Sequence, residues 1–189
     1  MHYAFGHILA ASTTAPMSTA PAAPHISCSR MAIGTAVSTT IEAWWKKVGA
    51  KRYPNASEVF ITADAGGSNG YRSHVWKYEL QRLADKLNIA IHVSHFPPGT
   101  SKWNKVEHRL FSFISINWRG RPLRSYETIV SLIANTTNRG GLIVRARLDR
   151  RRYPTGRKVS AKDLSALRIE RNDFHGDWNY VIRPRNNVC

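Results

Sequence analysis

Between Glu58 and Val93 a short apolar run, a patterned helix and a second apolar run follow one another, and this order limits the possible folds. Residues 58–64 (EVFITAD) form the first run, which is typical of a strand buried on both faces. From about Arg72 to Leu87, apolar residues recur at helical spacing. Residues 89–93 (IAIHV) form the second run. Strand, helix and strand in this order predict a right-handed βαβ unit with parallel strands, and therefore an α/β fold.

Further elements are expected on both sides of this unit. Apolar spacing and helix-start signals predict helices at 39–48, 104–118, 125–138 and 160–167. Residues 142–148 alternate between apolar residues and Arg, as a half-exposed strand would.

The composition changes at residue 38 and divides the chain into two expected parts. Twenty of residues 1–37 are Ala, Ser, Thr or Pro, and Arg30 is their only charged side chain. A stretch that lacks a core pattern is expected to stay disordered. We therefore expect a disordered or out-of-frame segment at 1–38, followed at 39–189 by a folded domain with a basic C-terminal extension. The first part is open to two interpretations, a linker or a frame-shifted or mis-started N-terminus.

The net charge indicates the class of partner. Lys and Arg number 28 against 12 Asp and Glu, which gives a formal charge of +16. Such a surplus favours a polyanion, and nucleic acid is the first candidate; a basic composition that serves solubility alone is the alternative. Cys28 and Cys189 form no Cys-x-x-Cys pair, which argues against a zinc ribbon or a disulfide framework. No apolar run reaches the roughly 20 residues that span a bilayer, so we expect a cytoplasmic protein without a membrane partner.

Asp64 ends the first predicted strand and opens a Gly-rich loop. Ligands of open α/β sheets gather at the carboxyl ends of the strands, so this carboxylate is a candidate site residue. An Asp that only forms the turn is the alternative.

Glu107 is the second candidate carboxylate. It heads a helical face that is otherwise apolar, with Phe111, Ile114 and Trp118. A carboxylate there needs a compensating partner, and a divalent cation supplies one. Asn104 and Glu107 also have the spacing of an N-cap and an N3 residue, so a structural capping pair is an equal alternative.

The two carboxylates together predict a more specific chemistry. An Asp at the end of one strand and a Glu on the helix after the next strand are brought into one crevice. Hard oxygen ligands of this kind suit Mg²⁺ or Mn²⁺. Two such ions, about 3.5–4 Å apart, activate a water or a 3′-hydroxyl and stabilise the leaving oxygen of a phosphodiester. Asp64 and Glu107 are therefore candidate metal ligands for phosphodiester chemistry.

Longer motifs around both carboxylates resemble a known family. Residues 61–70 (ITADAGGSNG) resemble the second-Asp motif of the Rhodopirellula-type transposase DDE domain, a family of bacterial insertion-sequence transposases. Residues 96–108 (FPPGTSKWNKVEH) resemble its Glu motif and are also similar to the Asn-x-x-Glu segment of mariner-like transposases. The tail motifs at 153–156 (YPTG) and 173–180 (DFHGDWNY) look like the tail of the same family. The resemblance covers about residues 39–184.

The resemblance implies an RNase H-like fold in which three carboxylates hold two Mg²⁺ or Mn²⁺ ions. Asp64 would be the second carboxylate and Glu107 the third, supported by Asn69 and Asn104. The partners implied are DNA, as insertion-sequence ends and target, and further copies of the chain in a transpososome. The expected location is the bacterial cytoplasm, at the nucleoid.

One part of the family pattern has no counterpart in this sequence. The first carboxylate should lie on the opening strand of an antiparallel meander, but no Asp precedes Asp64, and the only earlier acids are Glu42 and Glu58. We therefore expect an incomplete core that lacks the first antiparallel strands, in an N-terminally truncated transposase with little activity alone. Two alternatives are a non-catalytic basic DNA-binding module and a defective transposase remnant.

The basic residues and histidines are weaker signals. A cluster of Arg and Lys is expected to track DNA phosphates, with a solvated charged face as the alternative; its members are Lys102, Lys105, Arg109, Arg145, Arg147, Arg150, Arg151 and Arg152. His92 and His95 have His-x-x-His spacing but should diverge on a strand, which disfavours a metal site there.

Overall fold

The computed structural model describes residues 4–5, 8–12, 28–29, 34–66, 69–100, 103, 105–151, 153 and 156–185, with only the main chain at 4–5, 8–12, 28–29, 34–37 and 105–109. Its elements in chain order are β1 (Ala4–Phe5), β2 (Ile8–Ser12), β3 (Cys28–Ser29), α1 (Gly34–Trp44), the π-helical turn η1 (Trp45–Gly49), α2 (Ala50–Arg52), β4 (Glu58–Ala63), α3 (His74–Leu87), β5 (Ala90–His95), α4 (Lys105–Trp118), α5 (Tyr126–Ala134), α6 (Ala161–Ser165), β6 (Ile169–Arg171) and β7 (Asn179–Ile182).

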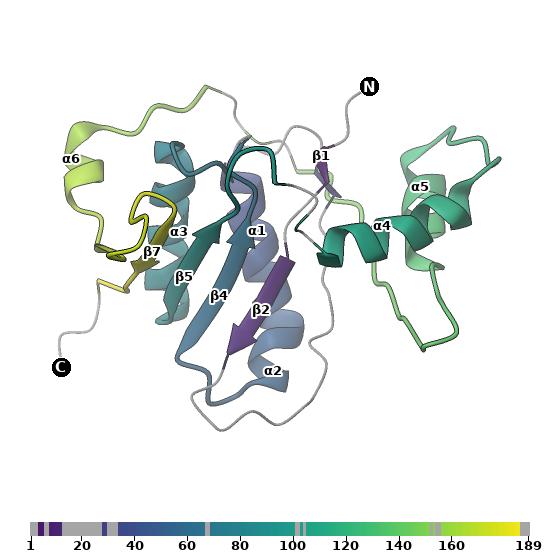
Figure 1. Ribbon diagram of the computed structural model, residues 1–189, viewed down its shortest axis with the longest axis horizontal. Helices are drawn as coiled ribbons and strands as arrows, with labels where there is room; N and C mark the ends of the chain where they lie inside the picture. Colours follow the sequence, from purple (N-terminus) through teal and green to yellow (C-terminus); the bar gives the residue numbers. More distant parts are fainter. Residues whose placement is uncertain are drawn as a thin grey trace.

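A five-stranded sheet in the order β2-β4-β5-β7-β6 forms the centre of the fold. Strands β4 and β5 are parallel, with Glu58 opposite Ala90 and Ala63 opposite His95. Helix α3 connects them, which confirms the predicted βαβ unit. Strand β7 is antiparallel to β5, and β6 is antiparallel to β7. The chain therefore has a mixed α/β architecture (Figure 1).

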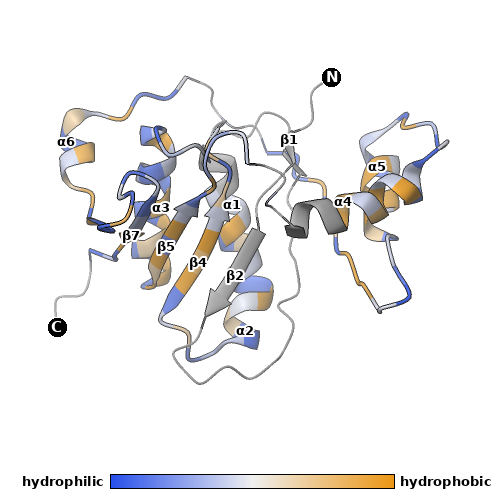
Figure 2. Ribbon diagram, in the orientation of Figure 1, coloured by the Kyte–Doolittle hydropathy of each residue, from blue (hydrophilic) through white to orange (hydrophobic). Residues whose placement is uncertain are grey.

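Helices α1 and α3 pack together and cover one face of the sheet (Figure 1). Val59 and Ile61 of β4 belong to the core against these helices, whereas Phe60 between them is 37% exposed. The expectation that this strand is buried on both faces is therefore wrong, because both helices lie on the same side. Figure 2 shows the hydrophobic residues of β4 and β5 beside those of the helices. The core comprises Ile41, Trp44, Trp45, Val59, Ile61, Trp76, Leu80, Leu83, Ala84, Ile89, Ile91, Val93, Tyr180 and Ile182.

Helix α3 has defined signals at both ends. The Ser73 hydroxyl accepts a hydrogen bond from the main-chain N–H of Trp76, as an N-cap residue does. Asn88 ends the helix in the left-handed conformation, with φ of 52°, and Asn tolerates that conformation better than most residues. Ser73 therefore fixes where α3 begins after the loop that follows β4, and Asn88 fixes where α3 ends before β5.

Helices α4 and α5 form a second small core beside the sheet (Figure 1). Residues 142–148, predicted as a strand, have no regular secondary structure. Their period-two pattern is nevertheless real, because Val144 is buried in the α4–α5 core while Ile143 is 74% exposed. The segment packs on helices instead of pairing with a strand, which corrects the prediction.

The N-terminal part differs from the expectation for residues 1–38 in two ways. Strand β2 pairs antiparallel with β4, with Ile8 opposite Thr62 and Ser12 opposite Glu58. Helix α1 begins at Gly34, earlier than the expected boundary. The expectation that this part supplies no strand to the sheet is therefore corrected. The physical reason is that β4 would otherwise present an unpaired edge, and the apolar stretch Ile8–Ser12 pairs with it.

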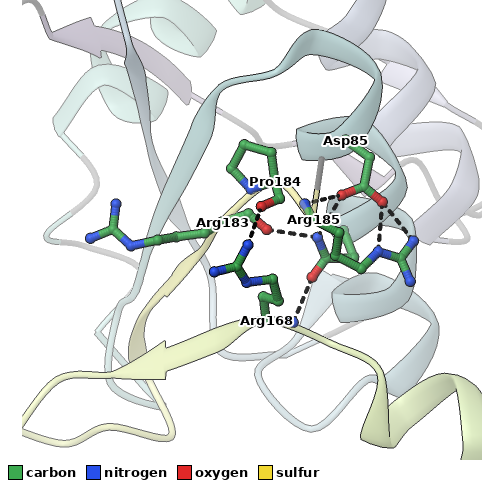
Figure 3. Close-up of polar contacts among 6 residues, drawn as sticks. Asp85, Arg168, Arg183, Pro184 and Arg185 are labelled. Carbon is green, nitrogen blue, oxygen red and sulfur yellow. Dashed lines mark hydrogen bonds and ion pairs between the residues drawn. The ribbon is translucent and has the colours of Figure 1, made fainter. Parts of the chain in front are cut away.

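The C-terminal segment is attached to α3 by polar contacts (Figure 3). The guanidinium of Arg185 donates two hydrogen bonds to Asp85 Oδ2, at 2.9 and 2.6 Å, and its main-chain N–H donates to Oδ1 at 2.8 Å. The guanidinium of Arg168 donates to the carbonyl oxygen of Pro184 at 3.0 Å. These contacts hold the end of β7 beside the last turn of α3.

Candidate functional site

The carboxyl ends of β4 and β5 meet at one edge of the sheet. The main-chain N–H of Phe96, after β5, donates to the carbonyl oxygen of Ala63 at 2.8 Å. Asp64 follows Ala63 directly, so its side chain lies where ligands of α/β sheets usually bind. The structure thus places this predicted residue at the edge that the sequence indicated.

The Asp64 carboxylate lies in an electrostatic environment that disfavours its charge. Its Oδ1 atom is buried and has no hydrogen-bond partner within the described residues. Burial raises the pKa of this carboxyl group above its ordinary value of 3.8. An ionised carboxylate with an unpaired buried oxygen is costly, and a bound cation would remove that cost. The Asp64 carboxylate is therefore suited to bind a divalent cation.

His95 fixes the main chain beside this carboxylate. Its Nδ1 atom lies 3.1 Å from the carbonyl oxygen of Asp64, and its Nε2 atom lies 3.2 Å from the hydroxyl of Tyr180. The hydroxyl of Tyr180 accepts a hydrogen bond from Trp76 Nε1 at 3.1 Å. Because a carbonyl oxygen only accepts, we assign the proton of the neutral imidazole to Nδ1. A series of hydrogen bonds through Trp76, Tyr180, His95 and Asp64 therefore joins α3, β7, β5 and the end of β4.

The pKa of His95 is consistent with a neutral ring. Burial lowers it below its ordinary value of 6.5, the hydrogen bond to the Asp64 carbonyl opposes this, and the positive charge of Lys77 lowers it further. The neighbouring strand histidine, His92, instead lies 3.2 Å from Glu58 through its Nε2 atom. The interpretation that His92 and His95 diverge is confirmed, because the two residues lie three positions apart on β5 and therefore on opposite faces of the sheet. In the described part of the chain, no three His, Cys, Asp or Glu side chains gather as a metal-binding group.

The second half of the predicted metal site is only partly described. Glu107 lies in the first turn of α4, but its side chain is outside the described part, as are those of Lys105 and Arg109. Lys102 and Asn104 lie outside the described residues. Asn69, predicted to support the site, is buried in the loop after β4. Whether Asp64 and Glu107 share a crevice therefore stays a prediction.

The basic segment after α5 divides into two kinds of arginine. Arg145 and Arg147 are exposed and form no ion pair within the described residues. Arg150 pairs with Glu127, and Arg151 pairs with Asp149. Arg152 lies outside the described residues. The first two are therefore the better placed to contact a phosphate.

The sequence alone does not predict the roles of His95 and Tyr180 in this site. The sequence presents His95 only as one half of a His-x-x-His pair and Tyr180 only as part of a tail motif. The available signal was the position of His95 beside the Pro-rich segment, at the end of the strand next to Asp64. Its contact with a residue 85 positions away has no local pattern.

Comparison with known proteins identifies a family. A family model described as the Rhodopirellula transposase DDE domain matches residues 26–184. No curated protein and no solved structure matches the chain. Among the described residues, no helix has both the length and the apolar character needed to cross a membrane.

Proposed function

Because the chain belongs to the Rhodopirellula transposase DDE domain family, we propose that it takes part in DNA transposition by metal-dependent hydrolysis and transfer of DNA strands. The observation that carries this proposal is the Asp64 carboxylate, with a buried oxygen that lacks a partner within the described residues. It stands at the carboxyl end of β4, where the family's second Asp is expected.

Asp64 and Glu107 are the residues that we propose to hold Mg²⁺ or Mn²⁺. When bound, such ions activate the attacking hydroxyl and stabilise the leaving oxygen of a phosphodiester. Asp64 would contribute a carboxylate whose position is fixed by His95 through the adjacent main chain. Glu107 would contribute the second carboxylate from the first turn of α4, and Asn69 and Asn104 would support them.

We further propose that the domain is an RNase H-like core. The support is the parallel β4–β5 pair, with α1 and α3 on one face. The family resemblance implies a first carboxylate on the opening strand of an antiparallel meander. Strand β2, with the sequence ILAAS, contains no acid, and residues 1–41 contain no Asp or Glu at all.

The missing acid has a consequence for activity. Two cations that lie close together need several anionic ligands, and this chain supplies two at the proposed place. We therefore expect weak DNA binding with a steep salt dependence and little cleavage by this chain alone. A non-catalytic DNA-binding role is the second candidate, and the charge of +16 favours it.

A rescue experiment tests the catalytic proposal. An Asp-bearing meander from the family is joined to the N-terminus, and cleavage of insertion-sequence ends is measured with Mg²⁺ and Mn²⁺. Cleavage should appear and should be lost again in Asp64→Ala and Glu107→Ala. Strong metal-dependent cleavage by the unextended chain that survives Glu107→Ala would refute the assignment of the site.

A further inference from the structure

A cavity of about 540 Å³ opens between the start of α3 and the turn that joins β6 to β7. Its walls include Tyr71, Arg72 and Lys77 on one side and His175, Asp177 and Trp178 on the other. Its volume lies in the range of small-ligand sites, roughly 300–1,000 Å³. These residues have no part in the metal site or the basic segment described above.

The cavity has an excess of positive charge. Lys77 is half-buried and forms no hydrogen bond or ion pair through its ammonium group within the described residues; the ammonium lies 5.5 Å from the centre of the Tyr180 ring. Burial lowers the pKa of Lys77, the charge of Arg171 lowers it further, and Asp177 opposes this. Asp177, the acid on the wall, is 3.6 Å from Arg171. A bound anion would therefore be stabilised here.

Arg72 adds a second cation to the same wall. Its side chain is exposed, and its guanidinium carbon lies 5.1 Å from the centre of the Tyr71 ring. Within the described residues it forms no ion pair. Arg72 and Lys77 lie in the loop and first turn on one side of the cavity, so both can face one phosphate group.

Aromatic rings form the opposite part of the wall. The rings of His175 and Trp178 are stacked, with centres 5.2 Å apart and an angle of 21°. Tyr71 meets Trp178 edge-on, with 5.8 Å between the ring centres. Beside them Phe174 is 72% exposed, with its ring centre 4.4 Å from that of His175. Flat rings next to cations are the combination that binds unpaired nucleotides, because every base has a face that can stack.

The cavity is connected to the strand end that carries Asp64. The carbonyl oxygen of Trp178 accepts a hydrogen bond from the main-chain N–H of His95 at 2.9 Å. The ring centres of Tyr71 and His95 are 6.2 Å apart, and His95 contacts the main chain of Asp64. A DNA strand held in the cavity would therefore run close to Asp64.

We propose that this cavity binds one unpaired nucleotide of the DNA strand on which the Asp64 site acts. Arg72 and Lys77 contact its phosphate, and its base packs on the rings of Trp178 and His175. Paired bases within a duplex have both faces stacked, so they cannot use these rings. The inference rests on the proposed function for its substrate, but binding in the cavity requires no metal.

The test is fluorescence anisotropy of the full chain with a labelled eight-nucleotide oligothymidylate, in EDTA at moderate salt. The variant Arg72→Ala/Lys77→Gln is compared with Arg52→Ala/Lys51→Gln. The control pair removes the same charges from exposed positions on α2, which precedes β4. We expect the cavity variant to lose about tenfold in affinity and the control to lose much less. Equal losses in both variants would overturn the proposal.

A second comparison isolates the rings. Trp178→Leu, and the exposed Phe174→Ala and His175→Ala, are titrated with the oligonucleotide and with a version that carries abasic sugars. Thermal unfolding confirms that each variant is folded. The ring variants should weaken binding of the first ligand and leave binding of the abasic one unchanged. Equal binding of both ligands by the unmodified chain would refute base packing.

Failure of this proposal and failure of the proposed function give different results. Asp64→Asn should not weaken oligonucleotide binding in EDTA, because the cavity works without metal and the substitution removes a negative charge near the DNA. If the cavity variants bind normally while Asp64→Asn abolishes Mn²⁺ binding, the cavity proposal alone fails. If the cavity variants lose binding while Asp64→Asn has no effect on Mn²⁺, only the metal site fails.

Discussion

The imidazole Nδ1 of His95 lies 3.1 Å from the main-chain carbonyl oxygen of Asp64 and links the ends of two parallel strands. The same ring contacts Tyr180 on β7. A buried neutral histidine thus sets the main-chain position of the carboxylate that we propose as a metal ligand. Loss of the ring should disturb both the fold and the site.

The substitution His95→Phe should lower the free energy of unfolding by about 1–3 kcal/mol at neutral pH, because buried hydrogen-bond partners are left unpaired. Burial lowers the pKa of His95 in the folded state below its ordinary value of 6.5. The unfolded chain therefore takes up the proton first as the pH falls below that value, and the folded state loses stability. The variant should lack this part of the pH dependence. Urea unfolding at several pH values measures both effects, with the exposed His74→Ala as control.

The substitution Asp64→Asn should raise the stability of the protein. Burial raises the pKa of Asp64 above 3.8, so the folded state is penalised as the pH rises through and above that value. The variant should be more stable than the unmodified chain by at most about 1 kcal/mol at neutral pH, because solvent screens a half-exposed carboxyl group, and the gain should shrink as the pH falls towards 3.8. Thermal unfolding without divalent ions measures this. A large loss of stability in Asp64→Asn would show that Asp64 has a structural partner instead.

The ion pair between Arg185 and Asp85 should anchor the C-terminal segment. Burial raises the pKa of Asp85, but hydrogen bonds from Arg185 and Gln81 outweigh this and hold it below its ordinary value. The stability from this pair is therefore present above pH 3.8 and is lost as the pH falls through the lower folded-state pKa. Arg185→Ala should cost about 1–3 kcal/mol at neutral pH. Arg183→Ala, which breaks the more exposed pair with Glu170, should cost less than about 1 kcal/mol in the same urea titration.

The two kinds of arginine after α5 should differ in DNA binding. Each phosphate contact contributes about 0.9 to the slope of log affinity against log salt. Removal of Arg145 and Arg147 together should therefore reduce this slope by about 2. Removal of Arg150 and Arg151 should reduce it less, because Glu127 and Asp149 already neutralise them. Equal slopes for both double variants would contradict the distinction. Anisotropy with a labelled duplex at several salt concentrations provides the slopes.

The parts of the fold that follow from local patterns could be predicted from the sequence. The βαβ unit is one case, because β4, α3 and β5 each carry their own periodicity. Strand β2 could not be found in this way, since its pairing with β4 depends on residues about 50 positions away and its sequence is short and rich in Ala. Residues 142–148 are the opposite case, in which a local pattern predicts a strand that does not form. Their period-two pattern places alternate side chains against α4 and α5.

Only the part of the site that depends on neighbouring residues in the sequence could be predicted. The sequence predicts Asp64 as a site residue because it ends an apolar run and opens a Gly-rich loop. The contacts of His95 with Tyr180, and of Tyr71 with Trp178, join residues far apart in sequence. Their chemistry appears only when β7 is paired with β5.

Binding of Mn²⁺, measured by electron paramagnetic resonance of the free ion, tests the central claim most directly. The unmodified chain is compared with Asp64→Asn, Glu107→Gln, the double variant and the exposed control Asp173→Asn. We predict that each single site variant weakens Mn²⁺ binding at least about tenfold, that the double variant is little worse than either single one, and that the control is unchanged. Unchanged Mn²⁺ affinity in Asp64→Asn, or a loss as large in Asp173→Asn, would contradict the assignment of Asp64 and Glu107 as one metal site.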